Sequence, residues 1–159
     1  MILPIAGVAT LLVLATTAAA QTPGRFEIAA TRPIPPGKIA VELSSQSELG
    51  RELRGQVMER LARRGNDVGA SGGHVLLLSV FYPRRIARAS PADAPTSAAA
   101  TDVLRLTLTV RRFGSAEALW SARAACVVAP AAAFAASGRM LDALFADPDR
   151  TRQGDANCP

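Results

Sequence analysis

One histidine, two cysteines and a set of arginines are the side chains whose chemistry can be judged from type and spacing. His74 is the sole histidine, and a zinc site or a Ser-His-Asp or Cys-His arrangement would need it beside suitable partners. A Ser–Lys pair would depend on Lys38, but Ser44 and Ser45 are typical of a helix start. The sequence therefore predicts no catalytic residue, no metal site and no cofactor.

Arg105, Arg111 and Arg123 fall on the polar side of two adjacent predicted strands, 102–113 and 117–128. Further arginines stand near the ends of the predicted strands: Arg84, Arg85, Arg88 and Arg112. Because a guanidinium group binds phosphates and carboxylates through paired hydrogen bonds, this cluster predicts an anionic partner. The alternative is an ordinary solvent-facing sheet.

Cys126 and Cys158 are the two cysteines of the chain. In an oxidising compartment they are expected to pair, closing a loop of about thirty residues and stabilising the fold by roughly 3–4 kcal/mol in the chain-entropy model. The alternative is a buried thiol at Cys126 and a reactive thiol on the tail.

The N-terminal twenty residues carry no charged side chain. An apolar run from Ile2 to Leu14 leads to Ala18-Ala19-Ala20 and then to polar Gln21, a pattern typical of a signal peptide cleaved near Ala20/Gln21. The alternative is an uncleaved membrane anchor over 2–20. No cysteine near this point could carry a lipid. The sequence thus predicts a periplasmic or secreted protein, peripheral to a membrane at most.

The formal net charge of +5 belongs to residues 21–159, and Lys38 is the only lysine among the 18 basic residues. An exported protein does not meet nucleic acid. The positive charge therefore points to an anionic lipid or glycan surface or to an acidic envelope protein. The alternative is a basic surface without a dedicated partner.

The folded part is predicted to be one domain, 38–148, that follows an extended Pro-rich leader at 21–37. Within the leader, alternating Phe26, Ile28 and Ala30 suggest a short edge strand. A strand then runs from Ile39 to Leu43. The helix from Ser44 to Gly65 has apolar residues every four positions, and Ser45 with Glu48 has the spacing of a capping box.

The second half is predicted to be mostly sheet. His74 to Tyr82 has the apolar composition of a central strand, and 84–101 is expected to be a mobile loop. The two alternating strands 102–113 and 117–128 form a hairpin. Pro130 begins a second helix that ends at Asp147-Pro148, and 149–159 is a polar tail held only through Cys158.

This order of strand, helix, three strands and helix predicts an α+β fold. We expect a two-layer sandwich whose mainly antiparallel sheet has about four strands, with both helices on one face.

Three motifs carry a resemblance: the helix with spaced apolar residues from Leu49 to Gly65, the Leu119-Trp120 pair in the hairpin, and the closing Phe145-Ala146-Asp147-Pro148. This layout resembles small Gram-negative cell-envelope proteins of unknown function. It is also distantly similar to the LPS-assembly lipoprotein and the auxiliary lipoproteins of lipid transporters, although their lipid-attachment cysteine is absent. The resemblance implies an assembly or binding role without catalytic residues.

The leading hypothesis is a non-enzymatic periplasmic binding or envelope-assembly accessory protein. It would use the arginine-bearing sheet face or an exposed strand edge to contact a protein, a lipid or a glycan. One alternative is a secreted hydrolase with an unrecognised active site, for which a deep pocket gathering His74 with a serine and an aspartate would be evidence. Another is a purely structural secreted domain.

Overall fold

The computed structural model describes residues 23–83 and 101–158, so the predicted signal peptide and residues 84–100 of the predicted loop lie outside it. The strands are β1 (Arg25–Ala30), β2 (Lys38–Leu43), β3 (Asp67–Gly69), β4 (His74–Phe81), β5 (Asp102–Arg112), β6 (Ala118–Val128) and β7 (Arg152–Asp155). The helices are α1 (Glu48–Arg63), a short 3-10 helix η1 (Pro130–Ala132) and α2 (Ala133–Phe145).

All seven strands form one mixed sheet in the order β3-β2-β4-β5-β6-β1-β7. β2 is parallel to both β3 and β4, and the other neighbours are antiparallel. The α+β class is therefore confirmed, but a sheet of about four strands was wrong. β3 and β4 are parallel to β2 because α1 carries the chain from the end of β2 back to the side of the sheet at which β2 begins.

Two of the additional strands, β1 and β7, come from the predicted leader and the predicted polar tail, and of these two segments only the first was expected to contain a strand. β1, expected at an edge, lies between β6 and β7, and its Phe26 and Ile28 are buried. β7 comes from the polar tail and pairs with β1 over Arg152–Asp155. Its Gly154 lies against the ring of Phe26, where an added Cβ would approach the ring to 2.7 Å. The tail is thus held by a strand as well as by Cys158.

Helix α1 buries the predicted stripe of Leu49, Leu53, Val57 and Leu61. Its N-cap is Ser47, whose hydroxyl accepts a 3.0 Å hydrogen bond from the amide of Gly50, so the predicted Ser45 capping box was wrong. No helix within the described ranges combines the length and apolar character needed to cross a bilayer.

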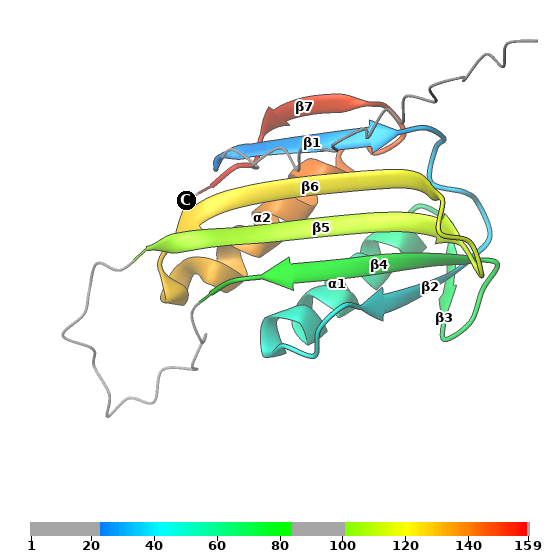
Figure 1. Cartoon of the computed structure of the whole chain (residues 1–159), viewed down its shortest axis with the longest axis horizontal. Coiled ribbons are helices and arrows are strands. Elements are labelled where there is room, and N and C mark those ends of the chain that lie inside the picture. The colour runs from blue at the N-terminus through cyan, green and yellow to red at the C-terminus, as the bar shows by residue number, and fades with distance from the viewer. Residues whose placement is uncertain (1–22, 84–100, 159) are drawn as a thin grey trace, which may run out of the picture.

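Figure 1 shows α1 and α2 behind the sheet, on one of its two faces. The core lies between these layers, where alternate residues of β5 from Leu104 to Val110 are fully buried. Trp120 of β6 is also fully buried, and its indole Nε1 donates a 2.6 Å hydrogen bond to the carbonyl of Pro148. This bond joins the middle of the sheet to the segment between α2 and β7. The opposite face of the sheet, which no described helix covers, is called the open face below.

The connection from β3 to β4 makes a close backbone approach that a single substitution can test. A Cβ built on Gly72 would lie 2.5 Å from the carbonyl oxygen of Lys38, whereas a Cβ on Gly73 would meet nothing within 4 Å. Neither glycine has a positive φ. We expect Gly72→Ala to lower the free energy of unfolding by about 1–3 kcal/mol through overpacking. Gly73→Ala, the matched control, should change it by less than about 1 kcal/mol. Equal urea midpoints for the two variants would contradict this close approach.

Candidate functional site on the open face of the sheet

The open face is lined mainly by the alternate residues of the two longest strands, β5 and β6. On β5 these are Val103, Arg105, Thr107, Thr109 and Arg111, and on β6 they are Leu119, Ser121, Arg123, Ala125 and Val127. The leucines between the β5 residues point into the core. Arg105, Arg111 and Arg123 therefore share this face.

The strand register separates these arginines. Arg105 lies opposite Ala125, and Arg123 lies opposite Thr107, so Arg105 and Arg123 are diagonal neighbours. Arg111 is six positions further along β5, about 20 Å from Arg105 at the usual rise of a strand. The structure therefore brings two of the three predicted residues together and leaves Arg111 at the other end.

Carboxylates accompany the arginines on the β1 and β7 side of the face. Glu27 stands opposite Arg123, and Asp155 stands opposite Arg25. Oppositely charged residues in such cross-strand positions attract one another. The open face is therefore mixed in charge, and Arg105 differs from its neighbours because Ala125 and Phe81 are the residues directly opposite it.

Large apolar side chains are exposed beside Arg105, at the end of the sheet where β4 and β6 end and β5 begins (Figure 1). Phe81 is 54% exposed and Val127 is 46% exposed. The guanidinium carbon of Arg105 lies 5.7 Å from the centroid of the Phe81 ring, within cation–π range. Val103 lies opposite Val127 and completes a contiguous group. Phe81, Val103, Arg105 and Val127 are called the Phe81 patch below.

A second exposed aromatic ring lies at the opposite end of the same strands. Phe113 is 70% exposed in the turn between β5 and β6, directly after exposed Arg112. This Arg–Phe pair matches Arg105 and Phe81 in composition but lies at the far end of β5. It therefore provides control substitutions for the Phe81 patch.

The edges of the sheet offer less to a partner than its open face. Edge strand β3 has three residues and edge strand β7 has four. Arg54 Nε donates a 2.8 Å hydrogen bond to the carbonyl of Val41, the β2 residue that follows the pairing with β3. At β7, the Asp155 carboxylate accepts a 2.7 Å bond from the Asn157 amide. Short, occupied edges of this kind disfavour strand addition.

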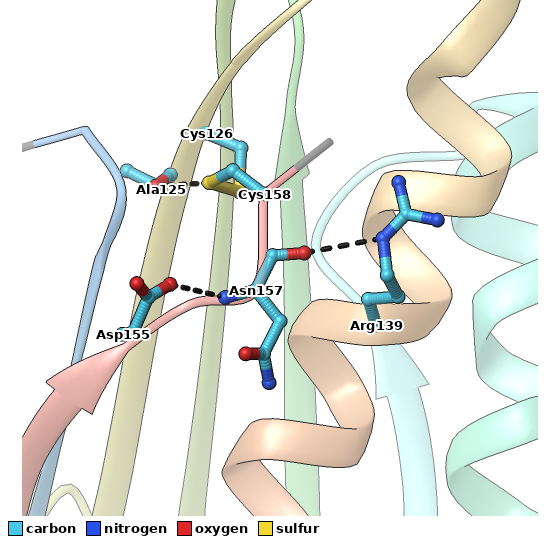
Figure 2. The surroundings of a disulfide bond; sticks show 6 residues. All are labelled: Ala125, Cys126, Arg139, Asp155, Asn157 and Cys158. Carbon is cyan, nitrogen blue, oxygen red and sulfur yellow. Dashed lines mark hydrogen bonds between the residues drawn. A yellow bond between two sulfur atoms is a disulfide. The ribbon is translucent and has the colours of Figure 1, made fainter.

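The predicted disulfide is confirmed. Cys126 and Cys158 are bonded, with their Cα atoms 5.5 Å apart and a sequence separation of 32. Figure 2 shows the bridge beside β7, with Arg139 of α2 donating a 3.1 Å hydrogen bond from Nε to the carbonyl of Asn157. The bridge and this bond hold the segment after β7 against β6 and α2.

A hollow of about 240 Å³ lies between the C-terminal ends of α1 and α2. Its lining residues are Arg60, Arg63, Arg64, Asp142, Phe145 and Ala146. The arginines are already paired: Arg60 with Asp142 at 2.5 Å, Arg64 with Asp149 at 2.7 Å, and Arg63 with Glu59. The lining contains neither His74 nor a serine, so it is not the pocket that the hydrolase alternative requires. Among the described residues, no group of histidine, cysteine or acidic side chains could hold a metal ion.

No family model and no curated protein matches the chain. Solved structures of PelC from Paraburkholderia phytofirmans are similar in fold. One PelC dodecamer is 12% identical, with a TM-score of 0.50, and the match covers 80% of this chain and 97% of that chain. A dodecamer of a PelC variant is 14% identical, with a TM-score of 0.49 and coverage of 80% and 98%. At such identities the similarity concerns the fold alone.

Proposed function

We propose that this chain is an exported, non-enzymatic binding or assembly accessory protein of the cell envelope, and that the Phe81 patch is its contact surface. The observation that carries the proposal is the exposure of Phe81 and Val127 beside Arg105 on a sheet face that no described helix covers. Aromatic residues and arginine are enriched at interfaces relative to the rest of a protein surface. Aromatic residues and arginine dominate the binding energy of protein interfaces.

Arg105 is the arginine best placed to receive an anionic group. Arg123 and Arg25 each have a carboxylate residue directly across the sheet, Glu27 and Asp155 respectively. Arg105 has Phe81 and Ala125 in those positions, and its charge lies over the Phe81 ring. A guanidinium on an aromatic face keeps its outer donors available for phosphate or carboxylate.

Export is supported by the N-terminal pattern and by the bridge. A disulfide is stable in an oxidising compartment and rare in the cytosol. The bonded pair Cys126 and Cys158 therefore fits a periplasmic or secreted protein. The resemblance to small envelope proteins supports the same location and a binding role.

Envelope retention tests the proposal. We expect Phe81→Ser and Arg105→Ser each to weaken retention on isolated envelope fractions about tenfold, the effect of losing a central interface residue. Both side chains lie at the surface, so the thermal midpoint of unfolding should stay close to that of the wild type.

Phe113→Ser and Arg112→Ser are the matched controls, since they remove the same residue types at the far end of β5. They should bind as the wild type does. Unchanged retention of the Phe81 and Arg105 variants, or an equal loss in the controls, would refute the Phe81 patch as the contact surface.

A further inference from the structure

The size of the Phe81 patch limits the kind of partner that it can hold. Its two strongly exposed apolar side chains, Phe81 and Val127, present on the order of 200 Å² of apolar surface. A stable protein interface usually buries about 800 Å² on each partner, of which rather more than half, about 450 Å², is apolar. Next to the patch on the open face, Ala125 is fully buried, and the side chains that reach the surface, Thr107 and Arg123, are polar or charged. A protein partner would therefore bury only a small apolar area, surrounded by polar and charged residues.

Peripheral binding to a lipid surface requires a much smaller apolar area than binding to a protein does. Phe side chains of peripheral segments insert into the boundary between headgroups and acyl chains, and basic residues beside them are attracted to anionic headgroups. In the Phe81 patch, Phe81 and Val127 supply the apolar part and Arg105 supplies a guanidinium over the ring. An anionic phospholipid matches both, because its phosphodiester offers paired oxygens to the guanidinium and its acyl chains lie next to them.

The position of the patch also suits a planar surface. It lies at the end of the sheet where β4 and β6 terminate and β5 begins (Figure 1). α1 and α2 lie behind the other face of the sheet, so they would not separate the patch from a membrane. Arg123 of β6 lies on the same face, and the acidic residue opposite it, Glu27, belongs to the more distant strand β1.

Resting on the proposed binding function, we infer that the partner of the Phe81 patch is an anionic phospholipid surface, contacted peripherally. Phe81 and Val127 enter the headgroup boundary, and Arg105 binds a lipid phosphate. No span of the membrane is involved. Binding of this kind is reversible and weakens as salt rises, because part of the attraction is between Arg105 and lipid charge.

The test is co-sedimentation of the full chain with two vesicle types, one of phosphatidylcholine alone and one with equal parts phosphatidylglycerol. We expect the wild type to partition onto the anionic vesicles at least tenfold more strongly, and less so in high salt. Phe81→Ser should reduce this partition about tenfold. Arg105→Ser should reduce it about fivefold, the effect of one basic residue at an anionic surface. Phe113→Ser and Arg112→Ser should stay within about twofold of the wild type.

Three results would overturn the lipid inference: no vesicle binding, equal binding to both vesicle types, or binding that the Phe81 and Arg105 substitutions leave unchanged. Any contribution from residues 1–20 is common to every variant, so differences between variants report on the patch. Should vesicle binding be absent while envelope retention still depends on Phe81, the partner is a protein or a glycan. In that case the lipid inference fails and the proposed binding function stands.

Discussion

The Trp120→Ala variant is expected to lose about 3–5 kcal/mol of its free energy of unfolding, the usual loss when a large aromatic side chain is removed from a core. Trp120 is fully buried between the sheet and the helices, and its ring lies 6.4 Å from that of Phe145. Its removal leaves a cavity that rigid neighbours on β6 and α2 can fill only in part. Since a small domain has only about 5–15 kcal/mol in total, this one substitution should remove about a fifth of that stability or more.

A second substitution separates packing from hydrogen bonding. Trp120→Phe keeps an aromatic ring but removes the Nε1 donor, leaving the buried carbonyl of Pro148 without its 2.6 Å partner. An unsatisfied buried acceptor costs about 1–3 kcal/mol, so this variant should fall between the wild type and Trp120→Ala. Urea denaturation followed by circular dichroism measures all three. A loss below about 1 kcal/mol for Trp120→Ala would mean that the core is not organised around this ring.

Removing the disulfide should lower the free energy of unfolding by about 3–4 kcal/mol, since the bridge closes a loop between residues 32 apart in sequence. Reduction of the wild type and the Cys158→Ala variant should give similar values. Cys158 is the position to substitute because Cys126 is fully buried, and a change there would alter packing as well as the cross-link. Similar values from reduction and from Cys158→Ala would show that the cross-link itself is responsible. Denaturation with and without reductant provides the comparison, and an unaffected Cys158→Ala protein would contradict it.

Reduction of the disulfide should also loosen β7 locally. Among the strands of residues 23–83 and 101–158, β7 pairs only with β1, and it spans four residues, so its amides depend on the bridge more than those of β5 do. On reduction, hydrogen exchange of Leu106 should accelerate by the factor that the loss of global stability sets, and exchange of Gly154 and Ala156 should accelerate beyond that factor, because edge segments also open by themselves. Uniform acceleration across the sheet would show instead that the bridge stabilises the fold as one unit.

The regular elements were predictable because their side chains follow a clear period. Four-residue spacing from Leu49 to Leu61 identified α1, and alternation from Leu104 to Val110 identified β5 and the face on which Arg105 lies. Alternation of Phe26 and Ile28 also marked β1, but β3 and β7 had no such signal. β3 has only three residues, and β7 is polar because it stands at an edge.

The candidate site was predictable only in part. Alternation places Arg105, Arg111 and Arg123 on one face, but their spacing follows from the register of β5 against β6, which depends on the hairpin and its irregularity after Val110. The pairing of Glu27 with Arg123 joins strands far apart in sequence. Phe81 belongs to a continuous apolar run, and such a run cannot show which of its residues stays exposed.

The position of β1 constrains the order in which the molecule can be completed. Its two neighbours, β6 and β7, are both synthesised much later. The amide of Ala30 donates a hydrogen bond to the hydroxyl of Thr151, which is 121 residues away in sequence. β1 is synthesised early, so its Phe26 and Ile28 stay unburied until β6 and β7 have been synthesised and can pair with it. Chains whose closing contacts join such remote segments fold slowly, and the waiting strand is the part most open to capture by a chaperone.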